Sequence, residues 1–202
     1  MEKNFEIQSF FHHFPASVAE YCFQLWQDHP FTFVVSKTRS SKLGDYRYQS
    51  KAGHRISVNQ NLNSYAFLVT YLHEVAHLLV YQQYKNKAKA HGPEWKTTFR
   101  ELFEPILDEA LLPPHLVQAL QAYLKDPAAS SCGCGPLMEV LRDFDPPSDE
   151  LPLEQLPEGT WFQIKNLTLC KRNLRRSRYL CESAGASKRY LVSKHALVKP
   201  CS

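Results

Sequence analysis

The feature that most constrains this chain is His73-Glu74-Val75-Ala76-His77, an H-E-x-x-H sequence within a stretch of helical periodicity. Apolar residues recur at helical spacing from about residue 64 to residue 84, so this stretch is predicted to form one long helix. On a helix, positions i and i+4 lie on the same face, and both imidazoles can therefore reach one metal ion. Glu74 projects from the adjacent face of the same turn, where it can act as general base toward a metal-bound water. The sequence thus predicts a metal centre built on a helix.

The third ligand determines the kind of site, because structural zinc sites use four protein ligands whereas catalytic sites use three and keep one position for water. In metzincins, a glycine and a third histidine occupy the positions that Val80 and Gln83 have here, so that class is excluded. His91 is the best candidate, because it lies just before a helix that is expected to begin at Pro93. Glutamates on that helix remain alternative third ligands, and Glu94 would complete a structural site with four ligands. The glutamates are Glu94, Glu101 and Glu104.

The other elements predicted around the long helix indicate an α+β domain. An amphipathic helix is expected over residues 16–28, and three β-rich segments follow it. After the long helix, one helix is expected from Pro93 to about residue 106, and a shorter one from residue 113 to about residue 124. The three β-rich segments are residues 31–36, 42–48 and 54–59.

A change in composition divides the chain into three parts. An N-terminal domain of residues 1–125 holds the elements above. Residues 126–158 are rich in Pro, Gly and Ser and are predicted to be a linker with one short helix near residues 137–141. Residues 159–202 are predicted to form a small β module. Its expected strands are residues 161–164, 167–170, 178–181 and 190–192.

The small β module is also the basic part of the chain. The net charge is +4, with 14 Lys and Arg against 17 Asp and Glu in residues 1–150, and 10 against 3 in residues 151–202. Four arginines and a tyrosine lie on one expected hairpin, a composition that suits phosphate contacts and base stacking. A solvated hairpin without a ligand is the alternative. The predicted nucleic-acid-binding residues are Arg172, Arg175, Arg176, Arg178 and Tyr179.

The two-part histidine motif resembles that of the SprT/Spartan family of zinc metalloproteins, also called SprT-like. That family pairs H-E-x-x-H with a downstream H-G-x-x-aromatic segment, which corresponds to His91-Gly92-Pro93-Glu94-Trp95 here. The approach segment Ile56-Ser57-Val58-Asn59 is similar as well, and the resemblance covers roughly residues 16–125. It implies a zincin-like metalloprotease domain in which His91 joins the two motif histidines in holding one catalytic Zn²⁺, with Glu74 as general base. Well-studied relatives degrade proteins crosslinked to or bound on DNA.

The cysteines do not indicate a second metal site. Many relatives carry a zinc ribbon with paired cysteines in their C-terminal part, whereas this chain offers one knuckle, Cys132-x-Cys134, and no second one. Adding His195 gives a spacing that structural zinc sites do not usually have. We therefore expect one zinc and no second, with the cysteines reduced because no export signal is recognisable. The remaining cysteines are Cys22, Cys170, Cys181 and Cys201.

Two functions agree with these observations. The first is a zinc-dependent metallopeptidase that acts on nucleic-acid-associated proteins, with the basic module binding DNA or another nucleic acid. The second is a zinc-containing nucleic-acid-binding or stress-response and transcription-associated protein without turnover, against which the intact Glu74 argues. No apolar run is long enough to span a membrane and the first residues do not resemble a secretory signal, so a cytoplasmic location is expected.

Overall fold

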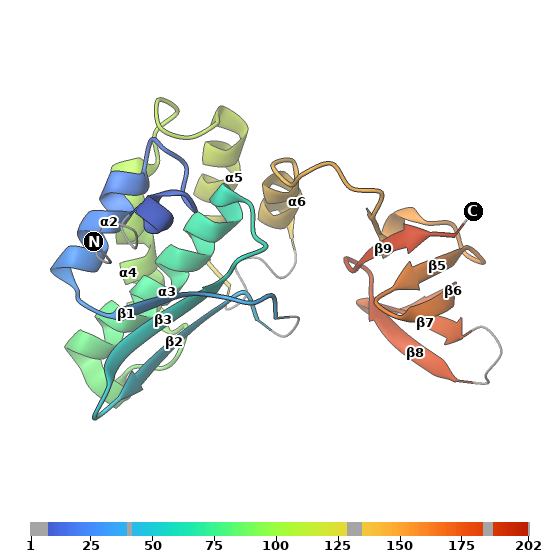
Figure 1. The fold of residues 1–202 in the computed structure, drawn as a ribbon, viewed down its shortest axis with the longest axis horizontal. Helices are drawn as coiled ribbons and strands as arrows, with labels where there is room; N and C mark the ends of the chain where they lie inside the picture. The colour runs from blue at the N-terminus through green and yellow to red at the C-terminus, as the bar shows by residue number, and fades with distance from the viewer. Residues whose placement is uncertain (1–7, 40–41, 129–134, 184–187, 202) are drawn as a thin grey trace. The chain divides into compact units, whose positions relative to one another are not determined.

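The computed structural model describes residues 8–39, 42–128, 135–183 and 188–201, and the chain forms two compact units, residues 1–145 and 146–202. Helices and sheets are both present, which confirms the α+β class. The first unit contains a three-stranded sheet with α-helices, and the second contains a six-stranded sheet (Figure 1). Within the described ranges, no helix is long and apolar enough to cross a bilayer.

The sheet of the first unit has the strand order β1-β3-β2 (Figure 1). β1 is parallel to β3, whereas β2 and β3 form an antiparallel hairpin whose turn ends at Gly53, where a φ of 75° favours glycine. The sequence predicted each strand to within two residues, and the structure adds the pairing. Because β2 pairs only with β3, it is an edge strand. The strands are β1 (Thr32–Ser36), β2 (Gly44–Gln49) and β3 (Gly53–Asn59).

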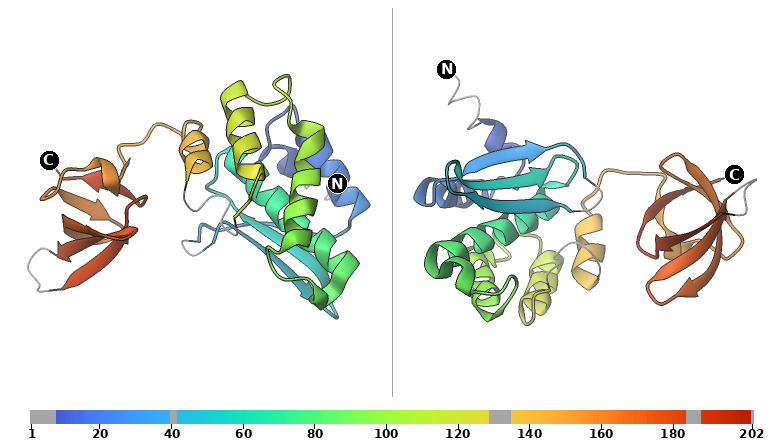
Figure 2. Two further views of the ribbon diagram at one scale, coloured as in Figure 1. Left: turned by 180° about the vertical axis from the view of Figure 1, so that it is seen from behind. Right: turned by 90° about the horizontal axis from the view of Figure 1, so that it is seen from below.

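The helices α3, α4 and α5 lie on one face of this sheet (Figure 2). The longest, α3, spans Ser64–Tyr84 as the sequence predicted, and it packs against β2 and β3. Its first turn is capped by the Asn63 side chain, whose Oδ1 accepts hydrogen bonds from the backbone N–H groups of Tyr65 and Ala66. The other α-helices are α2 (Ala19–Asp28), α4 (Pro93–Phe103), α5 (Pro114–Leu124) and α6 (Pro136–Arg142), and residues 8–11 are helical too.

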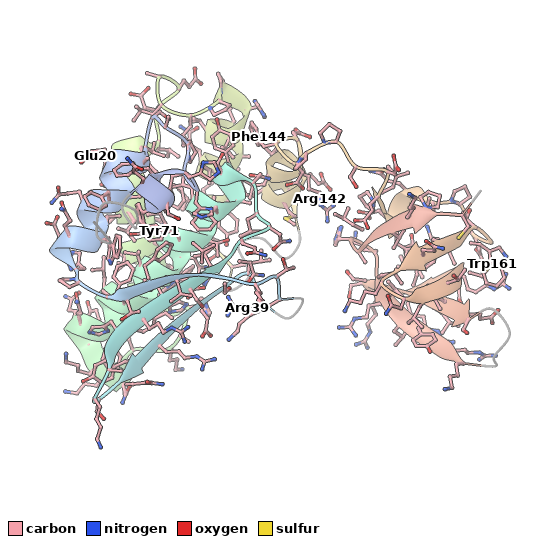
Figure 3. All side chains as sticks on the ribbon, in the orientation of Figure 1. Glu20, Arg39, Tyr71, Arg142, Phe144 and Trp161 are labelled. Carbon is pink, nitrogen blue, oxygen red and sulfur yellow. The ribbon has the colours of Figure 1, made fainter. Side chains whose placement is uncertain are left out.

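An aromatic core joins α3 to the sheet and to the N-terminal helices. At its centre is the fully buried Tyr71, which is labelled in Figure 3. Its ring lies 5.6 Å from that of Phe33 on β1 and 5.9 Å from that of Phe10, and its hydroxyl donates a hydrogen bond to the carbonyl of Cys22. α3 is therefore buried from both sides, by the sheet and by helices, which explains why apolar residues surround the histidines in its sequence.

The helix α6 belongs to the first unit, although the sequence placed it in a linker. Asn63 donates a hydrogen bond to the carbonyl of Leu141 on α6, and the Phe144 ring packs 4.2 Å from that of Tyr65. The residue that caps α3 thus also attaches α6 to it. The predicted linker is divided between the two units, because residues 126–145 belong to the first unit and residues 146–158 to the second.

The second unit is one sheet with the strand order β4-β9-β5-β6-β7-β8, packed around a small core that includes Phe162, Leu169 and Val198. The strands β5 to β8 were expected, whereas β4 and β9 were missed. β4 has two residues, too few to show periodicity. The strands are β4 (Leu151–Pro152), β5 (Trp161–Ile164), β6 (Leu167–Arg175), β7 (Arg178–Ser183), β8 (Arg189–Ser193) and β9 (Leu197–Pro200).

Candidate metal centre

Three histidine side chains converge on one point in the first unit. His73 and His77 project from consecutive turns of α3, and His91 reaches them from the turn before α4. Their Nε2 atoms lie 3.2 Å (His73 to His77), 2.9 Å (His77 to His91) and 3.1 Å (His73 to His91) apart. The structure thus brings together the three histidines that the sequence proposed as metal ligands.

Hydrogen bonds among the three rings cannot account for this arrangement. A neutral imidazole nitrogen either carries a proton or offers a lone pair, so one Nε2 atom cannot donate and accept at once. Among three mutually close Nε2 atoms, at least one pair is therefore donor with donor or acceptor with acceptor. A single cation removes this conflict, because all three lone pairs can point at it. Three nitrogens ~2.0–2.1 Å from a tetrahedral zinc would be ~3.3 Å apart, close to the distances found here.

The position of His91 depends on an uncommon backbone conformation. Its φ is 58°, a left-handed value that a non-glycine residue adopts at a cost of roughly 1–2 kcal/mol. The next residue, Gly92, donates its N–H to the carbonyl of Lys89, and Pro93 occupies the first position of α4. Strain of this kind is often found at functional sites. The tight turn aims the His91 imidazole back at α3.

Trp95 supports all three imidazoles from one side. Its indole is fully buried, with ring centroids 4.6 Å from His73, 5.5 Å from His77 and 4.8 Å from His91. The Nε1–H group donates to the backbone carbonyl of His73, and the other side of the ring system stacks on Phe99. The sequence identified Trp95 only as part of the motif, because nothing local predicts that one side chain contacts three rings.

The protonation of the three histidines suits metal binding. Burial lowers the pKa of His73 to about 3, and the neighbouring imidazoles of His77 and His91 add to the effect. Burial likewise lowers the pKa of His77 to about 4, and it lowers the pKa of His91. All three side chains are therefore neutral at pH 7, the form in which a histidine nitrogen offers its lone pair to a metal.

Glu74 lies beside the triad without joining it, on the side of α3 that faces β2. Its carboxylate accepts a hydrogen bond from the backbone N–H of Tyr46. Burial raises the pKa of Glu74 to about 8, and the charge of Asp45 adds to the rise. A cation bound by the three imidazoles would lower that pKa, because a nearby positive charge favours the carboxylate.

Gly44 is the residue that allows β2 to approach Glu74 so closely. A Cβ atom at position 44 would lie 2.8 Å from Cγ of Glu74 and 2.7 Å from Cγ2 of Thr70, closer than side-chain carbons can approach. The sequence predicted a strand through Gly44 but gave no reason for a glycine there. The reason is this contact between two elements about 30 residues apart.

An aromatic wall borders the site on its β2 side. The Tyr46 ring lies parallel to that of His77, 10° between planes and 6.5 Å between centroids, and the Tyr46 hydroxyl is 2.9 Å from Nδ1 of His54. Tyr48 and Tyr81 continue the wall with centroids 4.7 Å apart. Sequence reasoning missed these residues, because their only local signal is the alternation of tyrosines on one strand face.

The alternative ligands lie apart from the triad. Among the described residues, only His73, His77 and His91 form a group of metal-ligating side chains within 4.8 Å of one another, and no carboxylate belongs to it. Glu94 and Glu101 line a separate hollow with Gln83 and Thr98. Cys132 and Cys134 lie outside the described residues. In the second unit, Cys170 and Cys181 are buried, Cys201 is partly buried, and Nδ1 of His195 lies 2.9 Å from Oε1 of Glu154.

The predicted nucleic-acid-binding residues separate into three environments. Arg175, Arg176 and Arg178 are exposed at the turn between β6 and β7, and none forms an ion pair within the described part of the chain. Arg172 is paired with Glu182, 2.8 Å from Nε to Oε2. Tyr179 packs against the core of the second unit, and the Nζ atom of the buried Lys171 lies 3.9 Å from its ring centroid. One face of the Tyr179 ring is thus covered by an ammonium group.

Comparison with known proteins agrees with this geometry. A model of the SprT-like family matches residues 8–109, just over half of the chain, and the matched region includes β1, β2, β3, α3, α4 and all three histidines. No curated protein and no solved structure matches the chain. The family match confirms the resemblance that the histidine motif indicated. The chain belongs to the SprT-like family.

Proposed function

We propose that this protein is a zinc-dependent metallopeptidase with a zincin-like catalytic domain. The observation that carries the proposal is the convergence of three neutral imidazoles with a buried carboxylate directly beside them. Three protein ligands leave a coordination position open, as catalytic zinc sites require and structural sites do not. A structural site would also have no use for a carboxylate that is buried next to the ligands without binding the metal.

Each residue has a defined task in peptide hydrolysis. His73, His77 and His91 would hold the zinc, and bound zinc supplies Lewis acidity, which acidifies a water molecule and polarises the peptide carbonyl. Glu74 accepts the proton of the attacking water and passes it to the nitrogen of the leaving amine. The Tyr46 N–H group orients the Glu74 carboxylate for both transfers.

The edge strand β2 is suited to hold an extended peptide. Within the described residues β2 pairs with β3 along one side, so the other edge of β2 has no strand partner there. Backbone groups on an open strand edge bind extended chains without regard to side-chain identity. This arrangement supports a peptidase that accepts many protein substrates, provided that they offer an unfolded segment.

The second unit would bring the catalytic unit to nucleic acid. Its three unpaired arginines at the β6–β7 turn form a compact cationic group, and cations free of protein carboxylates are the ones available to phosphates. We call Arg175, Arg176 and Arg178 the turn arginines. The proposed substrates are therefore proteins associated with nucleic acid. A zinc-containing nucleic-acid-binding protein without turnover is the second candidate, and the same arginines would serve it.

The first prediction concerns the metal. His91→Ala should reduce zinc affinity by more than the ~10–100-fold that loss of an outer-shell partner costs, as should His73→Ala and His77→Ala. Zinc content after dialysis against a weak chelator measures this. His115→Ala is the control, because its ring stacks on Phe144 away from the triad. Full zinc content in His91→Ala would show that His91 is not the third ligand, and the glutamates of α4 would then be the candidates.

The second prediction concerns the general base. Glu74→Gln keeps the size of the side chain and its hydrogen bond but removes the proton acceptor, so cleavage of an unfolded protein should fall ~10²–10⁴-fold. Zinc content should stay at the wild-type level. Equal cleavage by both proteins, after removal of contaminating protease, would leave the non-catalytic protein as the better candidate.

The third prediction tests the same carboxylate without changing it. Gly44→Ala places a methyl group against Glu74 and Thr70, so the carboxylate must move. Cleavage should fall by at least tenfold while zinc content is kept, since Gly44 does not contact the triad. Gln49→Ala, an exposed position at the far end of β2, is the control and should remain active. Unchanged activity in Gly44→Ala would show that the position of Glu74 is not critical.

The fourth prediction concerns the turn arginines. Replacing all three by alanine should reduce the slope of log affinity for DNA against log salt by ~2–3, since each lost phosphate contact removes ~0.7–0.9. The matched control replaces Arg172, Lys194 and Lys199, which carry the same total charge but are each paired with a carboxylate. If both triple variants reduced the salt slope equally, the turn arginines would contribute to DNA binding only through net charge.

A further inference from the structure

The first unit has a strongly uneven charge distribution that the proposed function does not use. Residues 32–59, which form its sheet, carry six Lys and Arg and a single acidic residue, Asp45. The other residues up to position 150 carry 8 Lys and Arg against 16 Asp and Glu. The sheet is thus a basic segment in an acidic unit. Its cations are Lys37, Arg39, Lys42, Arg47, Lys51 and Arg55.

Strand register places the arginines of this segment on one face of the sheet. Phe33, Ile56 and Tyr46 are aligned across the three strands, and they face the helices, as the contact of Phe33 with Tyr71 shows. The neighbouring row, Thr32, Arg55 and Arg47, therefore points to the opposite face. We call this opposite face, which α3, α4 and α5 leave uncovered (Figure 2), the outer face.

Arg39 lies across the same outer face (Figure 3). Its Nε donates to Oδ1 of Asn59 at 2.8 Å and its Nη1 donates to Oγ of Ser57 at 3.3 Å, both on β3. Ser57 lies two residues from Arg55 along the strand, which is ~6.6 Å. The guanidinium groups of Arg39 and Arg55 thus follow one another along the sheet. The Nη2 atom of Arg39 is buried and has no hydrogen-bond partner among the described residues, so Arg47 and Arg55 are the exposed arginines of this face.

Arg47 and Arg55 face each other directly across β2 and β3. Like charges at opposite positions destabilise a sheet, by an amount similar to the ~0.2–1 kcal/mol that favourable pairs contribute. Arg47 is paired with Asp45 at 2.5 Å, but Asp45 also binds Lys42, and Arg55 has no ion pair within the described ranges. The local charge therefore exceeds what the only acidic residue of the segment can neutralise.

We propose that the outer face of this sheet binds the phosphate backbone of a nucleic acid. A polyanion would relieve the repulsion between Arg47 and Arg55 and would add acceptors for the guanidinium groups of these two exposed arginines. An acidic protein partner fits less well, since protein interfaces need apolar or aromatic anchors. The outer face offers Thr32 beside the arginines, with Val34 as its one apolar residue in the three paired strands. Ser57 and Asn59 point to the same face but are buried, and both accept hydrogen bonds from Arg39.

This inference extends the proposal that the protein acts on nucleic-acid-associated substrates, because it gives the catalytic unit its own contact with nucleic acid. The metal centre lies on the helix face of the same sheet, only one layer away from the outer face. A protein bound to the same nucleic acid would therefore be close to the edge strand β2. Contacts to phosphates alone carry no sequence information, so little sequence preference is expected.

The test uses the full chain with two background changes. Glu74→Gln prevents proteolysis, and the turn arginines are replaced by alanine so that the remaining DNA binding comes from other surfaces. Adding Arg47→Thr and Arg55→Thr, which keep strand propensity, should reduce the salt slope for single- and double-stranded oligonucleotides by a further ~1.5. Lys87→Ala with Lys125→Ala removes two exposed cations outside the sheet segment and should leave the slope unchanged. Binding is measured without cleavage, so this inference and the peptidase proposal can fail separately.

Stability distinguishes lost binding from lost folding. Arg55→Thr alone should leave the melting temperature equal or higher, because it removes a like-charge contact. Added DNA should raise the melting temperature of this variant less than that of the protein without the substitution. An unchanged salt slope in the double variant would overturn the proposal. So would a loss of binding to poly-glutamate with DNA binding intact, since the outer face would then recognise acidic protein.

Discussion

The structure depends on the convergence of three imidazole nitrogens at one point. Two of them come from α3, so their separation follows from helix geometry, and the third depends on a left-handed turn at His91. Three close nitrogens cannot all hydrogen-bond one another, and a cation bound by their lone pairs would remove this conflict. The fully buried Trp95, the burial of α3 between sheet and helices, and the strained turn all keep the rings in that arrangement.

The two faces of the sheet carry different residues. On the helix face, β2 approaches α3 so closely that only glycine fits at position 44, and the N–H of Tyr46 binds the Glu74 carboxylate. On the outer face, the same strands present Arg47 and Arg55 beside the guanidinium of Arg39. Because side chains alternate along a strand, a shift of one residue in the register of β2 would disrupt both faces at once.

The two units differ in what stabilises their charges. In the first, the cations of the sheet outnumber the acidic residues around them. In the second, several cations have partners within the unit: Lys171 binds backbone carbonyls and covers the Tyr179 ring, and Arg172 is paired with Glu182. The turn arginines form no ion pair within the described residues. A count of charges in the sequence therefore overstates how much of the basic module is available to a polyanion.

The sequence by itself determined what local geometry controls. The spacing of His73 and His77 places them on one face of any helix. The apolar period predicted a helix from about residue 64 to residue 84, and α3 spans Ser64–Tyr84. The sequence also identified the family through the histidine motif and named His91 as a candidate third ligand. It did not predict the distance between His91 and the other two histidines. Only the tertiary structure decided the contact of Gly44 with Glu74, the support of three rings by Trp95 and the face on which the sheet arginines lie. These depend on pairing between segments distant in sequence, which no local pattern encodes.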